Sequence, residues 1–306
     1  MYTRKSLVTM VVAALCAATA SAAMQPLTIS SAFNYDAVGT VEEIAYCNTF
    51  TGVDHQLTNI LGQHSMYSGQ TYLGGDGGLP ADGIIDGGNF EVGRGLTSRY
   101  ATAAADAAQS NIIRLRANSR ETLSAEVVLP AAEQQRYSAI NFAFSGERYK
   151  FEASKVTHYT ASIEVRYAGD SAWHVLWLST GDNATLGGSF GTGNGTSGLS
   201  SWDKNTDTAD WAVVHATEKR CGTAGSSGSR YSNTKAGATY LWKFANDLPL
   251  DGSKTLEALR ISVSTDGVNR PTGVNLFAAS AVPVPEPATA GLLALGAAGL
   301  IFRRRR

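Results

Sequence analysis

Three aspartates in a glycine-rich segment could act as ligands of a metal ion. Asp76, Asp82 and Asp86 lie where glycine is frequent. A Ca²⁺ ion takes about six to eight oxygen ligands, often supplied by loops. The spacing differs from the D-x-[DN]-x-[DN]-G pattern of an EF-hand loop. Two interpretations therefore stay open: a structural Ca²⁺ site, and a turn-rich loop whose carboxylates are solvated. No other cofactor is expected.

Tryptophan side chains could bind a sugar, because flat rings stack on the apolar face of a pyranose while polar neighbours bind its hydroxyl groups. Trp173, Val175 and Trp177 alternate with other residues, so we expect them to share the face of a strand that meets the core. Trp202 stands between a serine and an aspartate, beside a glycine-rich stretch. It is therefore the better candidate for an exposed sugar-binding platform.

Residue types that perform catalysis show no arrangement typical of an active site. A zinc enzyme needs about three protein ligands, and the histidines are scattered without an H-E-x-x-H pattern. A glycosidase needs two facing carboxylates, which a chain with 26 acidic residues could supply anywhere. The sequence therefore favours a protein that is not an enzyme, with an exported polysaccharide hydrolase as the alternative. The histidines are His55, His64, His158, His174 and His215.

Strands separated by turn residues must position these side chains. In Tyr159–Tyr167 apolar and polar residues alternate, as in a half-buried antiparallel strand. About ten further segments have similar composition, which predicts an all-β, antiparallel β-sandwich. Short helices are expected at 97–109 and near 54–61. The other strand segments are Thr28–Phe33, Gly83–Val92, Ile113–Ala117, Leu123–Leu129, Ile140–Phe144, Ala172–Leu178, Trp211–Ala216, Thr239–Ala245, Leu259–Val263 and Val274–Val282.

The order of these segments also resembles a known architecture. From Gly78 onward it is similar to the jelly-roll, galactose-binding-like sandwiches that occur as accessory domains in bacterial extracellular proteins. Residues 23–280 are expected to form one such domain, with 23–75 as its N-terminal segment. Sandwiches of this kind host binding, structural and catalytic roles, so the resemblance does not select a function. The segments that carry it are Gly78–Gly83, Asn111–Leu115, Tyr137–Gly146, Ile163–Tyr167, Leu256–Val263 and Val274–Ala281.

The N-terminus has the pattern of a signal peptide. Basic Arg4 and Lys5 precede an apolar segment at Leu7–Ala18. Small residues at Ala20 and Ala22 then form an A-x-A cleavage site, so residues 1–22 should be a helical signal peptide and Ala23 the first mature residue. An export translocon and a signal peptidase are the implied partners. Cys16 raises a lipoprotein as an alternative, although Leu15 stands where a lipobox has a small residue.

The C-terminus combines an extended spacer, an apolar run and a basic end. Prolines in residues 281–287 disfavour helix, so this spacer should be extended and accessible to a protease. Residues 288–302 form an apolar run that would be roughly 22 Å long as a helix, against a hydrocarbon core of about 30 Å. Residues 303–306 are all arginine, which predicts a short transmembrane helix with a cytoplasmic end. A C-terminal helix docked on the domain is the alternative.

These parts together resemble the PEP-CTERM sorting signal of exported proteins in Gram-negative bacteria that make exopolysaccharide. The resemblance implies transient anchoring in the inner membrane and removal of the anchor by an exosortase, a membrane-embedded cysteine protease. The protein would then reach the cell surface or the medium. The residues that carry the signal are Val284, Pro285, Glu286, Pro287, Arg303, Arg304, Arg305 and Arg306.

Charge and cysteine content narrow the possible partners. The chain has 26 acidic and 25 basic residues. The signal peptide and the C-terminal sorting segment together contain one acidic and six basic residues, so the body has 25 acidic and 19 basic residues and a net charge of −6. This balance argues against nucleic acid as a partner. Export permits a disulfide between Cys47 and Cys221, and two buried thiols are the alternative. We therefore expect an exported, non-enzymatic carbohydrate-binding protein associated with exopolysaccharide, with a structural biofilm component as a further alternative.

Overall fold

The structure is a computed structural model of the 306-residue chain. It describes residues 23–35, 38–39, 64–67, 80, 82–96, 110–117, 120–148, 158–182, 211–217, 221–222, 239–266 and 272–285.

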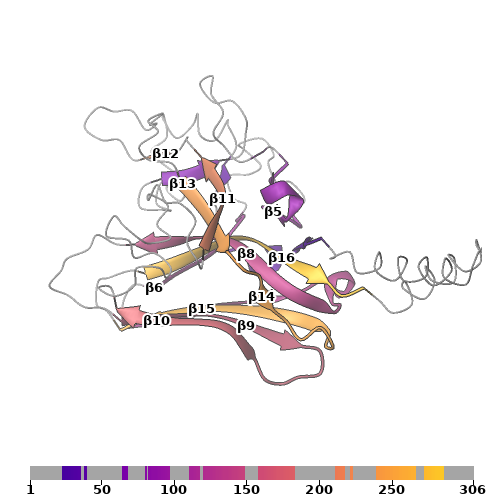
Figure 1. The fold of residues 1–306 in the computed structure, drawn as a ribbon. Helices are drawn as coiled ribbons and strands as arrows, with labels where there is room; N and C mark the ends of the chain where they lie inside the picture. The colour runs from indigo at the N-terminus through magenta and orange to yellow at the C-terminus, as the bar shows by residue number, and fades with distance from the viewer. Residues whose placement is uncertain are drawn as a thin grey trace, which may run out of the picture.

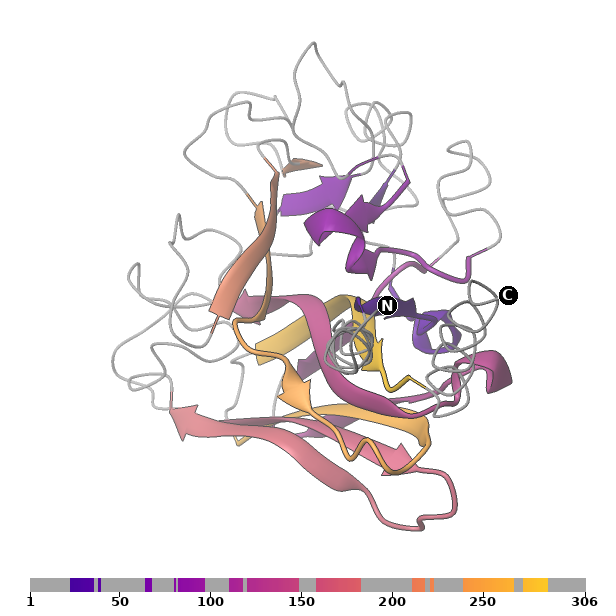
Figure 2. The same ribbon diagram turned by 45° about the vertical axis from the view of Figure 1, so that its right-hand side comes forward.

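Two sheets lie face to face and share a hydrophobic core (Figures 1 and 2). The seven-stranded sheet has the order β1-β16-β8-β13-β11, while β14 also pairs with β8 and β6 with β16. Its strands are β1 (Gln25–Leu27), β6 (Ile113–Ala117), β8 (Tyr137–Arg148), β11 (Trp211–Thr217), β13 (Thr239–Phe244), β14 (Leu248–Pro249) and β16 (Thr272–Pro283). The four-stranded sheet has the order β10-β9-β15-β7 and comprises β7 (Thr122–Val128), β9 (His158–Tyr167), β10 (His174–Asp182) and β15 (Leu256–Thr265).

Short elements complete the described part of the chain. A separate hairpin pairs β4 with β5, and β3 pairs with both β2 and β12. The described helical segments are three 3₁₀ turns. These elements are β2 (Val38–Gly39), β3 (His64–Tyr67), β4 (Ile84–Ile85), β5 (Phe90–Glu91), β12 (Cys221–Gly222), η1 (Ser30–Ala32), η2 (Asp86–Gly88) and η3 (Ala131–Glu133).

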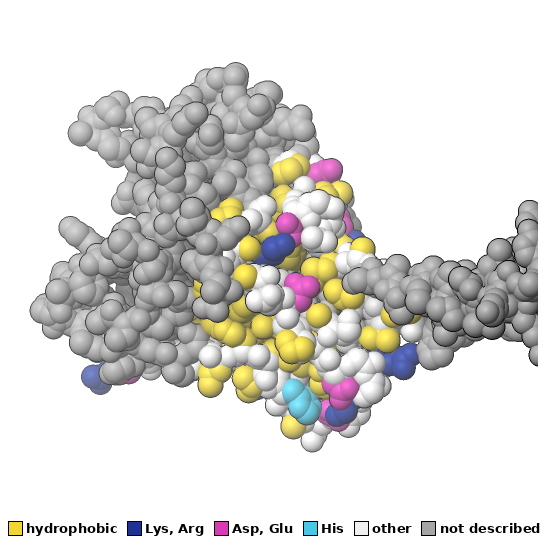
Figure 3. Space-filling view, in the orientation of Figure 1, with side chains coloured by type: hydrophobic (Ala, Val, Ile, Leu, Met, Phe, Trp, Pro, Cys, Tyr) yellow, Lys and Arg dark blue, Asp and Glu magenta, His cyan; other side chains and the backbone are white. Residues whose placement is uncertain are grey.

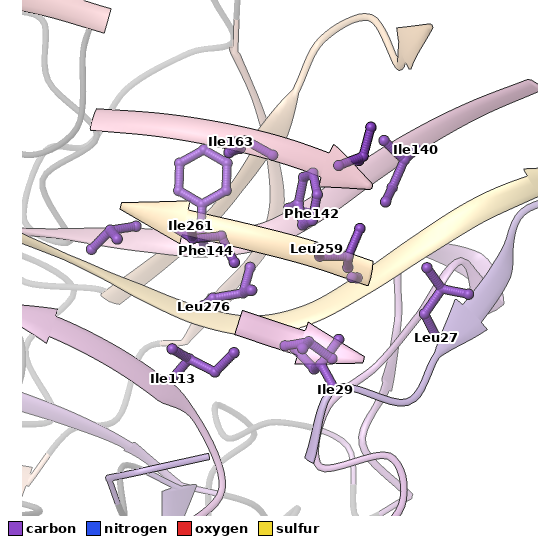
Figure 4. Packing of buried hydrophobic residues seen from close by; sticks show 14 of the residues in the cluster. Leu27, Ile29, Ile113, Ile140, Phe142, Phe144, Ile163, Leu259, Ile261 and Leu276 are labelled. Atoms are coloured by element: carbon purple, nitrogen blue, oxygen red, sulfur yellow. The ribbon is translucent and has the colours of Figure 1, made fainter. Parts of the chain in front are cut away.

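The main core lies between the two sheets and follows the alternation of the strands (Figure 4). In β9, Ile163 and Val165 point into it, and in β15 Leu259 and Ile261 do the same. Phe142 contributes from the opposite sheet and is fully buried. The predicted all-β architecture is therefore confirmed, since alternate residues of long antiparallel strands fill one shared interior.

Strand β16 is buried on both of its faces. Val274 and Leu276 join the main core, whereas Phe277 and Ala278 join a second cluster with Phe90 and other residues from β4, β5, β8 and β13. β16 pairs with β1, β6 and β8, so it lies in the interior of its sheet. The last described strand of the chain is therefore also a central one.

Two of the predicted strands are wrong in part. Thr28–Phe33 was expected to be one strand, but β1 ends at Leu27 and η1 follows. The reason is that Thr28 donates its backbone N–H and its hydroxyl to the carboxylate of Glu133, at 2.7 Å each, and so leaves the ladder. Gly83–Val92 forms the short hairpin β4–β5 instead, because Asp86 and the two glycines after it have positive φ.

The remaining strand predictions are confirmed, with ends that differ by a few residues. The predicted helices at 97–109 and 54–61 lie outside the described residues, as do the signal helix at 1–22 and the apolar run at 288–302.

Candidate functional site

The outer face of the four-stranded sheet carries a row of paired charges. Register places Arg260 of β15 between Glu164 of β9 and Glu126 of β7. The Nε atom of Arg260 lies 2.6 Å from Oε2 of Glu164, and its Nη1 atom lies 3.7 Å from Oε1 of Glu126. The hydrogen bond to Glu164 raises the pKa of Arg260. Arg260 on the middle strand is therefore paired with a carboxylate from each neighbouring strand.

An aromatic ring lies against this charged row. Trp173 precedes β10, and the guanidinium carbons of Arg260 and Arg166 lie 4.5 Å and 5.0 Å from its ring centroid. Arg166 in turn pairs with Glu257, with 3.3 Å between its Nε and Oε2 of the carboxylate. Cation–π contacts of this kind are worth about 0.5–1 kcal/mol at exposed sites. They fix the orientation of the half-buried Trp173 ring.

Hydroxyl groups continue the same face beyond the charges. Ser262 of β15 stands between Ser162 and Ser124, and in the next row Ser264 stands between Thr160 and Thr122. Among the described residues, none of these six side chains has a hydrogen-bond partner. Neighbouring strands are about 4.8 Å apart and alternate residues about 6.8 Å apart. The result is a regular grid of hydroxyls available to a ligand.

A β-bulge separates the tryptophans that the sequence placed together. The expectation that Trp173, Val175 and Trp177 share a core-facing side is wrong, because the register with β9 shifts between Val175 and Trp177. Trp177 packs in the core against Trp211, with 5.9 Å between ring centroids. Val175 is 56% exposed, and Leu178 is also exposed. The bulge thus leaves Trp173 and two aliphatic side chains outside the core.

Charges on the visible surface are mixed rather than gathered by sign. Figure 3 shows acidic and basic side chains side by side among apolar and polar ones. A further example is Asp170, which accepts hydrogen bonds from Lys254 at 3.0 Å and from His174 at 2.8 Å. These hydrogen bonds lower the pKa of Asp170, and the bond from Lys254 has the largest effect. Among the described residues on the face shown, no patch of one sign offers a site for a polyanion or a polycation.

The aspartates that could bind Ca²⁺ are engaged in contacts with the protein. Asp86 lies 2.6 Å from Nζ of Lys243 and accepts a hydrogen bond from Asn89. Asp82 accepts one from the backbone N–H of Ile84 at 3.0 Å. Asp76 lies outside the described residues. Within the part of the chain that the structure describes, no group of three or more acidic, histidine or cysteine side chains could hold a metal ion.

The predicted disulfide and the predicted sugar-binding tryptophan fall partly or wholly outside the described residues. Cys221 lies in β12, where its backbone pairs with Ser65 of β3. Cys47 lies outside the described residues, so the disulfide stays a prediction. Trp202 also lies outside them. The sequence analysis did not identify Trp173 as a surface residue. The alternation of apolar and polar residues gives no indication of the bulge that places Trp173 and Trp177 on different faces.

The sorting segment begins directly at the end of β16. Pro283 is the last residue of the strand, and the N–H of Val284 donates to the carbonyl of Arg136 at 2.9 Å. Pro285 is exposed, and so is Ala23 at the other end of the described chain. Residues 286–306, and Ala20 and Ala22 of the cleavage site, lie outside the described residues. The described residues contain no helix that is long and apolar enough to span a membrane.

Comparisons with known proteins match the tail and leave the body largely unassigned. No curated protein matches the chain. A solved structure of the carbohydrate-binding module CBM28, described as specific for non-crystalline cellulose, shares 6% identity and a TM-score of 0.28 over 56% of this chain and 73% of that one. A likeness this weak carries no argument about function. Residues 283–306 match the family described as the PEP-CTERM protein-sorting motif. The chain therefore carries a PEP-CTERM sorting motif, which marks an exported protein processed by exosortase.

Proposed function

We propose that the mature protein is a non-enzymatic surface or extracellular protein that binds neutral polysaccharide through the outer face of the four-stranded sheet. The observation that carries the proposal is that the Trp173 ring packs against a row of paired charges, which adjoins a grid of hydroxyls on the same sheet face. In this account a Gram-negative cell exports the precursor. The arginines at 303–306 hold the tail toward the cytoplasm, and exosortase releases the body to its exopolysaccharide.

Charge on this face favours an uncharged ligand. Arg166 and Arg260 are each paired with glutamate, and Glu126, Glu164 and Glu257 exceed them by one negative charge. A polyanion would meet no spare cation here. Binding would also have to displace ion pairs that individually contribute about 0–1 kcal/mol. Neutral sugars avoid that conflict, since their hydroxyls both donate and accept hydrogen bonds.

The shape of the face suits an extended chain. The hydroxyl rows cross three strands. On β10, exposed Leu178 lies opposite Ser162 in one of these rows, and exposed Val175 lies opposite Glu164 in the adjoining charged row. A polysaccharide laid across the strands could bind hydroxyls along its edge and present its C–H faces to Trp173 and these aliphatic groups. The hydroxyls would therefore provide the specificity, and the Trp173 ring most of the affinity.

Retention on the host's own exopolysaccharide tests the proposal. The processed protein should bind immobilised polymer without generating reducing ends, and Trp173→Ala should weaken binding at least tenfold. Ile84→Ala is the matched control, because Ile84 is 45% exposed but belongs to the β4–β5 hairpin. Undiminished binding by Trp173→Ala would contradict the site. New reducing ends would indicate a hydrolase instead, and a protein that neither binds nor cleaves would be a structural component.

Trp202 supplies a second variant, since the sequence predicts an exposed ring there. If Trp202→Ala alone abolishes retention, the sugar site lies at Trp202 and not on the sheet face. Loss of retention in both variants would extend the site to include both rings.

Mass spectrometry of the released protein tests sorting separately. Its C-terminus should lie near Pro285–Pro287, and a surface protein that still ends at Arg306 would contradict processing.

A further inference from the structure

The two ends of the folded body lie at the same edge. β1 and β16 are antiparallel neighbours, with Gln25 opposite Ala281 and Leu27 opposite Ala279. The start of β1 therefore lies beside the end of β16, as Figures 1 and 2 both show. The predicted first mature residue, Ala23, is two residues before β1. The sorting motif follows directly on the other strand.

Several contacts hold the chain in place up to this point. Pro283 pairs with Tyr137 of β8, and the N–H of Val284 donates to the carbonyl of Arg136 at 2.9 Å. Gly252 lies so close that a Cβ there would be 3.1 Å from the Val284 side chain. We call this surface the terminal edge; it comprises residues 23–25, 136–138, 252–253 and 283–285. The body thus fixes the tail to within one residue of Pro285.

The chain beyond the terminal edge is too short to let the body stand away from a membrane. From Pro285 to Ala288, where the apolar run begins, there are three residues. A fully extended chain spans at most about 3.6 Å per residue, or roughly 11 Å. The headgroup layer on one side of a bilayer is about 5–7 Å thick. An inserted tail therefore brings the terminal edge to the headgroups.

The N-terminal segment leads to the same place. The apolar part of the predicted signal peptide ends at Ala18, seven residues before Gln25. That length reaches roughly 25 Å when extended. A precursor that still has both apolar segments can therefore pair β1 with β16 while both segments are in one membrane. An arrangement with the two ends on opposite sides of the body would not allow this.

We propose that the terminal edge is a membrane-contact surface, on which the anchored protein rests against the lipid headgroups. This inference rests on insertion of the apolar run, which is part of the proposed function, but not on polysaccharide binding. The contact is lost when the protease removes the tail. Because β16 is paired as far as Pro283 and buried over residues 273–281, the cut leaves the strand whole and the released body keeps its fold.

Photo-crosslinking of the full-length chain in lipid vesicles tests the contact without any substitution. The vesicles would contain phosphatidylethanolamine, phosphatidylglycerol and a small fraction of a lipid with a diazirine in its headgroup. After irradiation, mass spectrometry should find adducts in the tail and on residues 136–138 and 252–253. Peptides from the outer face of the four-stranded sheet, at 122–126 and 260–264, should carry at least fivefold fewer.

A lengthened spacer supplies the matched control. Twelve Gly and Ser residues inserted between Val284 and Pro285 add up to about 40 Å of reach. Adducts on the terminal edge should then fall at least fivefold, while those in the tail persist. Equal labelling of the terminal edge and the sheet face, or edge labelling that survives the insertion, would overturn the inference. Absence of tail adducts would overturn the anchor itself, whereas polysaccharide retention is measured separately.

Discussion

Asn141 and Phe244 are joined by two hydrogen bonds that replace a missing part of the seven-stranded sheet. The Asn141 Nδ2 atom donates to the Phe244 carbonyl at 2.9 Å, and its Oδ1 accepts from the Phe244 N–H at 3.0 Å. β13 ends at Phe244 and β14 begins at Leu248, and both pair with β8 on the same side. The buried amide of Asn141 thus continues the ladder where the backbone leaves it.

Replacement of this side chain should therefore be costly. Asn141→Ala leaves the N–H and carbonyl of Phe244 without their partner and also removes the bond to Asp247. Unsatisfied buried groups cost about 1–3 kcal/mol each, so the free energy of unfolding should fall by about 2–4 kcal/mol in urea denaturation. Asn246→Ala is the control, because that side chain is exposed in the same connection, and it should change stability by less than about 0.5 kcal/mol. Similar values for both variants would contradict the role of Asn141.

Two glycines provide a second matched pair. A Cβ at Gly273 of β16 would lie 2.5 Å from the carbonyl oxygen of Leu115, a backbone atom that cannot move aside alone. A Cβ at Gly252 would meet the Val284 side chain at 3.1 Å, and a side-chain end can shift. Gly273→Ala should therefore lower stability by about 1–3 kcal/mol through overpacking, and Gly252→Ala should change it little. Thermal unfolding of the two variants measures the difference, and equal midpoints would be the contrary result.

The strands that the sequence predicted best are those with one buried face. Tyr159–Tyr167 alternates cleanly because β9 has the core on one side and solvent on the other. β16 was predicted from its apolar content alone, since both its faces are buried and alternation carries no information there. The failure at Thr28 has a different cause. Its bond to Glu133 joins residues 105 positions apart, which no local pattern can indicate.

The surface site was less accessible to sequence reasoning than the fold. The alternation of Trp173 with Trp177 predicted that both face the core. A single extra residue in β10 places them on opposite faces, so Trp173 lies outside the core. Its contacts with Arg166 and Arg260 come from two other strands, so only the register of the sheet reveals them. The sorting motif is the opposite case, because its function lies in a continuous stretch of residues that can be recognised before any folding.

The second hydrophobic cluster should be as important to stability as the main core. Phe277 of β16 is fully buried in it, and Phe142 is equally buried in the main core. Removal of a buried aromatic ring costs about 3–5 kcal/mol. Phe277→Ala and Phe142→Ala should therefore lower the free energy of unfolding by similar amounts in urea denaturation. A loss below about 1 kcal/mol for Phe277→Ala alone would show that the second cluster lies outside the cooperative unit.

Tyr137 should make stability depend on pH in the alkaline range. Burial raises the pKa of its hydroxyl, which donates to the carbonyl of Glu133 at 2.9 Å. Because the folded pKa exceeds the unfolded value of about 10, this contribution is complete below about pH 10 and is lost as pH rises through the folded pKa. Tyr137→Phe should therefore be less stable than the wild type by about 1 kcal/mol at pH 7, through the lost hydrogen bond.

The difference between the two proteins should then shrink as the pH rises above about 10, because the phenylalanine variant has no hydroxyl to ionise. Urea unfolding between pH 7 and pH 11.5 measures this, with the difference between the proteins as the readout, so that other tyrosines cancel. A difference that stays constant over the whole range would contradict the prediction. It would mean that the hydroxyl ionises equally well in the folded and unfolded states, and that the burial of Tyr137 in the folded protein does not disfavour its charge.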